Sequence, residues 1–187
     1  MRNKGYTLIE VLVSVAIFSI VLAGPTGLFV LSLRNQNMSL ALGETIDNTS
    51  HAVEYISRSL RMATKDRTGS CIEINYNYQN PESDTSKIRF LNYQGYCIEF
   101  SLSETKQLFQ RKSITGDSSS FDSEGFLTSD DLEIDNFQFL IAGGGQSDNL
   151  QPRVTMVFHI AKGSAGTDLP SMNVQSTVSQ RNLDVTY

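Results

Sequence analysis

The strongest constraint on this chain is a long uncharged apolar run near its N-terminus. From Val11 to Leu33 there are 23 residues without Asp, Glu, Lys or Arg. About 20 apolar residues in a helix span the hydrocarbon core of a bilayer, so this run predicts a transmembrane helix. Arg2 and Lys4 precede it, and no further basic residue comes before Arg34. Since basic residues stay on the cytoplasmic side, they predict a cytoplasmic N-terminus and an exported remainder.

One carboxylate, Glu10, lies inside the apolar sequence GYTLIEVLVSVAIFSIV that begins at Gly5. A charged side chain in a membrane segment is costly and is a functional-site hypothesis by default, with a partner to be named. The natural partner is an amine. Cleavage after Gly5 would create an α-amino group on Tyr6 that is positively charged near neutral pH. This amine cannot easily reach Glu10 of its own helix, but it could reach Glu10 of a neighbouring chain.

These residues resemble the N-terminus of type IV pilins and type II secretion pseudopilins. In that family a short basic leader ends in Gly, a prepilin peptidase cuts after it, and the new first residue is N-methylated. The resemblance implies cleavage after Gly5, methylation of Tyr6 and an assembly role for Glu10. Tyr6 replaces the usual Phe and keeps an aromatic ring. The implied partners are other pilin or pseudopilin subunits, the prepilin peptidase, the inner-membrane assembly platform and membrane lipid.

Two simpler interpretations compete for the same segment. A secretory signal peptide has a shorter apolar core, of about 7 to 15 residues, and a small-x-small cleavage site. Val21-Leu22-Ala23 could serve as that site, but Glu10 and the apolar continuation to Leu33 argue against it. A plain signal anchor explains the length of the run but not Glu10.

Composition limits the function classes. The 187-residue chain has a net charge of −5, and loss of Arg2 and Lys4 with the leader would make it −7. An acidic chain lacks the basic footprint of a nucleic-acid binder, so we predict no nucleic-acid partner. No G-x-S-x-G elbow occurs, and Gly143–Gly145 lacks the Gly-Lys-Ser/Thr of a phosphate loop. We therefore predict neither an enzyme nor a cofactor.

A single long helix is expected from about Thr7 to Ala63. Its first half is apolar on all sides, as in a lipid-embedded or bundled helix. Gly24, Pro25 and Gly27 predict a kink or a looser turn, since Pro removes a helix hydrogen bond. The second half is amphipathic, and its apolar positions step by 4 and 3, which predicts packing on a sheet rather than a coiled-coil seam. These positions are Leu42, Ile46, Thr49, Val53, Ile56, Leu60 and Ala63.

After the helix the pattern is that of short antiparallel strands. The predicted strands are 71–78, 87–94, 97–102, 108–114, 132–141, 154–160 and 172–178, with an irregular stretch at 116–129. The fold class is therefore α+β, with a long N-terminal helix packed on an antiparallel sheet in a pilin-like layout. The expected organisation is a leader at 1–5, a transmembrane and filament-core helix at 6–33, and an exported domain at 34–187.

Cys71 and Cys97 could form a disulfide in an exported domain. In a simple meander they would lie two strands apart, about 9.6 Å. A disulfide needs Cα atoms within about 7 Å. A bond therefore requires another strand order, or Cys71 in a loop that bends over the sheet; the alternative is two buried thiols. No zinc site is predicted, because His51 and His159 lack ligand spacing to the cysteines.

Acidic residues are concentrated between Ser113 and Pro152, where Lys and Arg are absent. Calcium takes six to eight oxygen ligands, but this spacing matches no EF-hand. A solvated acidic edge is the preferred interpretation, and a calcium loop is the alternative. The eight acids are Asp117, Asp122, Glu124, Asp130, Asp131, Glu133, Asp135 and Asp148.

The C-terminal half resembles the J-type pseudopilins and W-type minor pilins more weakly, at 132–139, 151–154 and 178–181. The resemblance implies a minor subunit of an inner-membrane-anchored type IV pilus or type II secretion filament. The protein would be single-pass in the bacterial inner membrane, with its N-terminus in the cytoplasm. The competing class is a membrane-anchored extracytoplasmic binding module that does not polymerise. Glu10 discriminates the two, since only assembly gives a membrane carboxylate a purpose.

Overall fold

The computed structural model describes residues 5–145, 150–163 and 170–182. Arg2 and Lys4 of the predicted leader and Asp148 of the acidic segment lie outside these ranges. The chain divides into two compact units, Met1–Ala41 and Leu42–Tyr187. The helix α1 contributes residues to both units, and we describe each unit by itself.

The helix α1 spans Leu8–Arg61, 54 residues, which confirms the long helix expected from the sequence. It continues without interruption through Pro25, where the sequence predicts a kink. Pro25 has no N–H to donate, but the next hydroxyl, of Thr26, donates to the carbonyls of Leu22 (2.9 Å) and Ala23 (3.0 Å). Loosening at Gly24, Pro25 and Gly27 within a filament stays a prediction.

The second unit confirms the expected α+β layout of a helix packed on antiparallel strands, but these strands form two sheets rather than one. The first has the order β1-β2-β3-β4-β5 and the second the order β6-β7-β8. The strands are β1 (Ala63–Thr64), β2 (Lys87–Asn92), β3 (Cys97–Leu102), β4 (Leu108–Ser113), β5 (Ser123–Phe126), β6 (Leu132–Ala142), β7 (Arg153–Lys162) and β8 (Ser171–Ser179), with a short 3-10 turn η1 (Pro81–Ser83) before β2.

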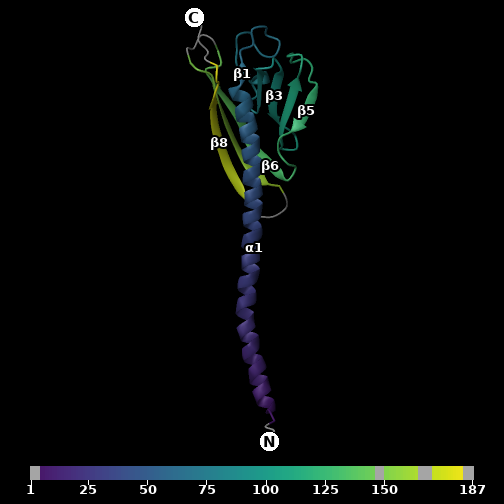
Figure 1. The fold of residues 1–187 in the computed structure, drawn as a ribbon, viewed down its shortest axis with the longest axis vertical. Coiled ribbons are helices and arrows are strands. Elements are labelled where there is room, and N and C mark those ends of the chain that lie inside the picture. The colour runs from purple at the N-terminus through teal and green to yellow at the C-terminus, as the bar shows by residue number, and fades with distance from the viewer. Residues whose placement is uncertain (1–4, 146–149, 164–169, 183–187) are drawn as a thin grey trace. The chain divides into compact units, whose positions relative to one another are not determined.

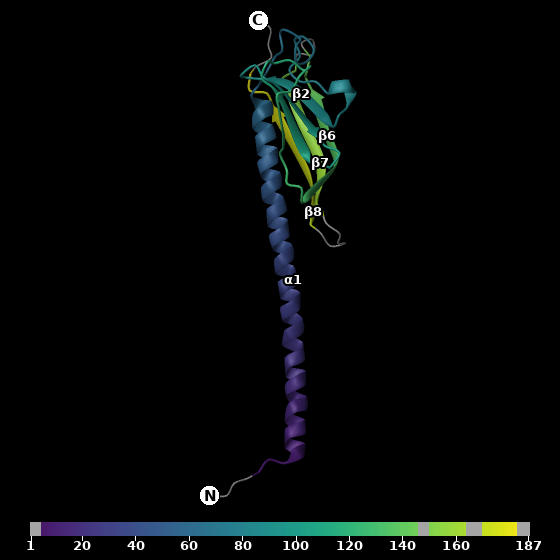
Figure 2. The ribbon, with the colours of Figure 1, turned by 90° about the vertical axis from the view of Figure 1, so that its right-hand side faces the viewer.

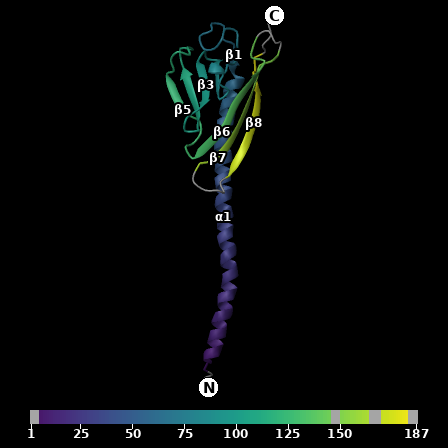
Figure 3. The ribbon, with the colours of Figure 1, turned by 180° about the vertical axis from the view of Figure 1, so that it is seen from behind.

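The two sheets lie side by side, with the C-terminal part of α1 on one face of both (Figures 1, 2 and 3). Asn80 links them, because its Nδ2 donates to the carbonyls of Lys87 (2.7 Å) and Phe139 (3.3 Å). A single apolar core fills the space between α1 and the sheets. Its fully buried side chains include Tyr78, Phe90, Phe100, Phe139, Phe158, Ile56, Leu60 and Met156.

The buried face of α1 differs in part from the predicted stripe. Thr49, Ile56 and Leu60 are buried as expected. Leu42 and Ile46 are 39% and 40% exposed, and the smaller side chains of Thr45 and Ala52 are buried in their place. Small residues on the covered face permit a close approach of the backbone to its neighbours. The buried Thr49 hydroxyl is satisfied by the carbonyl of Thr45 at 2.6 Å.

Two strand predictions are wrong. Residues 71–78 form turns and bends instead of a strand, and β5 lies within the stretch expected to be irregular. In the first case the backbone N–H groups of Cys71 and Ile72 donate to the carboxylate of Asp66 (2.8 and 3.1 Å). A side-chain acceptor thus competes with the sheet for these donors. Apolar residues alternate along 71–78, but their side chains do not share one buried face, since Ile74 is 59% exposed.

Candidate functional site

The predicted processing site lies just before the helix. Gly5, Tyr6 and Thr7 are non-helical and exposed, and α1 begins at Leu8. The Thr7 carbonyl accepts the first helical bonds, from the N–H groups of Glu10 (3.1 Å) and Val11 (3.3 Å). Exposed backbone outside a helix is the preferred substrate of proteases. The geometry therefore leaves the bond after Gly5 accessible.

Glu10 lies on an exposed face of the first turns of α1. The face surrounds a shallow hollow of about 520 Å³, lined by Tyr6, Glu10, Val11, Ser14, Val15 and Phe18. The Ser14 hydroxyl donates back to the Glu10 carbonyl at 2.7 Å, so it leaves the Glu10 carboxylate free. Within the described part of the chain, no cation pairs with that carboxylate.

The rest of the first unit presents an apolar surface. The most apolar stretch of 18 residues in α1 has a mean hydropathy of 2.3, and none of it is buried. Side chains such as Leu8 (79% exposed), Ile20 (75%) and Leu28 (72%) have no partner surface among the described residues of the unit. An apolar area of this size marks a membrane or protein interface. By length and composition α1 can cross a membrane.

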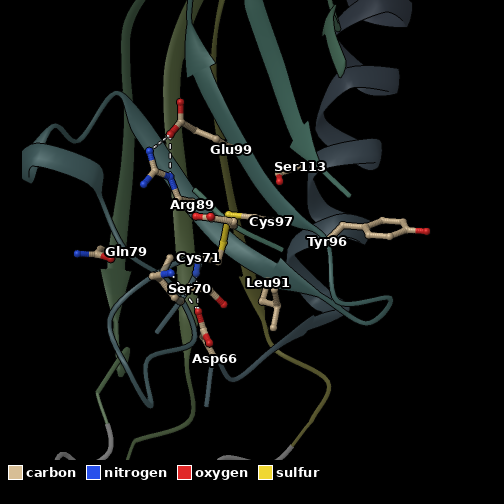
Figure 4. The surroundings of a disulfide bond; sticks show 12 residues. Asp66, Ser70, Cys71, Gln79, Arg89, Leu91, Tyr96, Cys97, Glu99 and Ser113 are labelled. Atoms are coloured by element: carbon tan, nitrogen blue, oxygen red, sulfur yellow. Dashed lines mark hydrogen bonds and ion pairs between the residues drawn. A yellow bond between two sulfur atoms is a disulfide. The ribbon is translucent and has the colours of Figure 1, made fainter. Parts of the chain in front are cut away.

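In the second unit, the structure joins Cys71 and Cys97 in a disulfide with a Cα–Cα distance of 5.4 Å (Figure 4). Cys97 is in β3 opposite Leu91 of β2, and Cys71 comes from the loop after β1. The sequence allowed a bond only with another strand order or with Cys71 in a loop that bends over the sheet. The structure shows the second arrangement. Both cysteines are buried, and with Ile72 and Leu91 they form a small cluster separate from the main core.

Asp66 holds this loop in place, and the sequence analysis missed it. Its carboxylate is fully buried and accepts five hydrogen bonds, from the N–H groups of Thr68, Gly69, Cys71 and Ile72 and from the Thr68 hydroxyl. Burial acts to raise the pKa of Asp66, but these donors outweigh it and lower the pKa to about 2. An Asp followed by Thr, Gly and Ser is typical of such a turn, and this signal could have identified it.

A second polar cluster missed by the sequence analysis lies on the same side of the five-stranded sheet as the disulfide. Arg89, Glu99 and Arg111 are direct neighbours on β2, β3 and β4. The Glu99 side chain is 2% exposed and pairs with Arg89 at 2.6 Å and Arg111 at 2.9 Å. The ring of Phe121 lies 5.8 Å and 5.2 Å from the two guanidinium carbons. This cluster fixes the strands laterally and presents no reactive group.

The acidic segment does not converge on one point. Asp122 accepts the Ile114 N–H at 2.7 Å, whereas Glu133 and Asp135 both pair with Lys106, at 3.1 and 3.3 Å. Asp117 accepts the N–H and hydroxyl of Ser119. Among residues 5–145, 150–163 and 170–182, no group of three or more His, Cys, Asp or Glu is placed to hold a metal.

Comparison with protein families matches residues 1–24 to the prokaryotic N-terminal methylation motif. Comparison with curated proteins and with solved structures gives no match. The motif supports the type IV pilin and pseudopilin class, and with it processing of the N-terminus and association with other pilin subunits. With the one apolar helix of the described residues, it indicates a membrane-anchored, single-pass protein.

Proposed function

We propose that this chain is a minor pilin or pseudopilin, a structural subunit of an inner-membrane-anchored type IV pilus or type II secretion filament. The observation that carries the proposal is Glu10, an exposed carboxylate without a partner cation within residues 5–145, 150–163 and 170–182, at the start of the apolar N-terminal stretch of α1. The prepilin peptidase would cut after Gly5, and Tyr6 would become the methylated first residue.

The pairing of Glu10 with the Tyr6 amine of a neighbouring subunit explains why a carboxylate is retained there. In a low-dielectric environment the attraction of opposite charges is many times that in water. The pair also depends on helix register, so it aligns successive subunits as well as holding them. The hollow beside Glu10, lined in part by Tyr6 and Phe18, offers space for the end of a second chain.

The topology follows from the same end of the chain. Arg2 and Lys4 keep the N-terminus in the cytoplasm, residues 6–33 cross the inner membrane, and the second unit is exported. The disulfide supports export, since such bonds persist in oxidising compartments. The J-type or W-type assignment rests on the resemblance in the C-terminal half, and the additional three-stranded sheet there agrees with an elaborated minor subunit.

Mass spectrometry of the mature protein tests the proposal. The first residue should be Tyr6 with one N-methyl group. Gly5→Val should block cleavage, whereas Gly24→Ala should not. Both glycines have no atom within 4 Å of an added Cβ, so neither substitution disturbs packing in the free chain. A mature N-terminus at Gly24 would instead identify a secretory signal peptide.

The alternative remains a membrane anchor for a binding module that does not polymerise. It would be favoured if cleavage after Gly5 occurs but the protein never enters a filament. The dependence of assembly on Glu10, considered in the Discussion, separates the two functions.

A further inference from the structure

An open groove with a mixed polar and apolar lining lies in the second unit where the two sheets meet. Its volume is about 460 Å³, within the range of about 300 to 1,000 Å³ found for small-molecule sites. The segment before β2 supplies most of its wall, and the end of β6 supplies the rest. The lining residues are Glu73, Tyr76, Tyr78, Gln79, Asn80, Ser83, Ile141, Gly144 and Gly145.

The wall of this groove is held rigidly. The Asn80 amide bridges the two sheets through Lys87 and Phe139. The buried Tyr78 hydroxyl donates to the Leu60 carbonyl at 2.6 Å. The Gln79 amide binds both the backbone N–H (3.0 Å) and the carboxylate (3.4 Å) of Glu73. A site fixed before its ligand arrives loses little conformational entropy on binding.

The backbone around the groove is strained. Of the five non-glycine residues with positive φ in the described chain, Asn75 (66°), Glu82 (57°) and Ser83 (61°) border this wall. Side chains rarely adopt this conformation without compensation. Strained residues of this kind cluster at functional sites and ligand clamps.

Several groups on the rim are available to a ligand. The second carboxylate oxygen of Glu73, the Tyr76 hydroxyl and the Ser83 hydroxyl make no hydrogen bond to any described residue. Tyr76 is 39% exposed, and a Cβ at Gly145 would lie 3.8 Å from its ring. The groove thus combines one accessible aromatic ring with hydrogen-bonding groups around it.

Charge and backbone pairing restrict the ligand. Among the described residues, the lining includes Glu73 and no Lys or Arg, so an anion would meet a negative charge that they do not compensate. The neighbouring backbone is already paired, since Gln79 and Arg89 exchange both of their N–H bonds, at 3.0 and 2.8 Å. A peptide therefore cannot pair as a strand with the edge of Gln79 that faces Arg89.

We propose that this groove binds a neutral saccharide of one or two rings. The C–H face of a sugar ring can stack on Tyr76, while its hydroxyls donate to Glu73 and exchange hydrogen bonds with the Ser83 and Tyr76 hydroxyls. This activity is additional to the filament role and does not depend on it.

The test uses the full-length protein in a detergent without a sugar head group. Calorimetric titration compares cellobiose, maltose and diacetylchitobiose with an anionic disaccharide of galacturonic acid. At least one neutral disaccharide should bind at a single site in the millimolar range, and the anionic one should not. If no neutral disaccharide binds, or if the anionic one binds as tightly, the proposal is wrong.

Variants locate the site. Tyr76→Ala should weaken binding about tenfold, which corresponds to about 1.4 kcal/mol. Gly145→Leu should abolish binding, because it covers the ring without removing a polar group. Tyr93→Ala is the matched control, since Tyr93 is 62% exposed and lies outside the groove. Circular dichroism shows whether each variant folds. If either Tyr76→Ala or Gly145→Leu does not fold, the test rests on the other of these two. Unchanged binding in the folded variant, or equal weakening by Tyr93→Ala, would overturn the assignment.

Discussion

The two parts of α1 belong to one continuous helix, yet they are built for different surroundings. All five buried residues of α1, from Thr45 to Leu60, belong to the second unit, and the apolar window that could cross a membrane is 0% buried. In the second unit the apolar groups find their partners within the same chain. In the first unit they require lipid or other helices. Helix formation is thus common to both parts, and the source of burial differs.

The largest expected effect concerns Glu10. Glu10→Ala should leave membrane insertion, cleavage after Gly5 and the exported fold intact, while incorporation into filaments is lost. Glu10→Gln should behave similarly, because the amide keeps the size but loses the charge. Incorporation is measured by immunoblotting of sheared filaments.

Glu44→Ala provides the matched control on the same helix. Glu44 pairs with Lys162 at 2.7 Å, but its side chain is 54% exposed, so the pair contributes at most about 1 kcal/mol. Assembly should be unaffected. Normal assembly of Glu10→Ala would show that this subunit does not depend on the pair, as for a subunit at the very tip.

The second prediction removes the first unit almost entirely. A fragment that starts at Arg34 should be soluble, monomeric and of mixed α and β content, because the buried side chains of α1 from Thr45 onward have their partners in the same unit. Light scattering and circular dichroism measure this. Oligomers formed through the α1 face would assign that face to an intersubunit bundle.

The third prediction contrasts two leucines of α1 within this fragment. Leu60 is fully buried, so Leu60→Ala should lower the free energy of unfolding by about 2 to 5 kcal/mol. Leu42 is 39% exposed, and Leu42→Ala should change it by less than about 0.5 kcal/mol. Urea denaturation measures both. Equal effects would mean that Leu42 is covered in solution.

The fourth prediction concerns the disulfide. Its cysteines are 26 residues apart, and closing a loop of this size in the unfolded chain is worth about 3.5 kcal/mol. The double substitution of Cys71→Ala and Cys97→Ala should destabilise the fragment by that order, and a reducing agent should have no further effect on it. If the wild-type fragment is equally stable with and without reducing agent, the bond is not formed.

The smallest predicted effect is the pH dependence due to Asp66. Its pKa is lowered from 3.8 to about 2 in the folded protein, so its contribution is present above about pH 4 and is lost as the pH falls toward 2. At one pKa unit per 1.4 kcal/mol, this amounts to about 2 kcal/mol. Asp66→Asn should therefore lower the free energy of unfolding by that amount at pH 7. The difference in this free energy between variant and wild type should shrink as the pH falls toward 2.

Much of the fold could be predicted because its signals are local. The bounds of α1 lie close to the expected Thr7 and Ala63, because the apolar run and the amphipathic stripe mark its two halves, and β2, β3 and β4 follow from alternation. The wrong strand at 71–78 has the same alternation. There the Asp66 carboxylate takes the backbone donors, and a spacing pattern does not reveal which acceptor a donor finds.

The candidate site shows the same division. The sequence by itself determined the apolar run, the position of Glu10 within it and the processing motif, since these depend on residues adjacent along the chain. The tertiary structure decided which face of α1 is buried, the division into two sheets, the approach of Cys71 to Cys97 and the groove beside Tyr76. These features join segments far apart in sequence, and the packing that selects among such pairings exists only once the chain is folded.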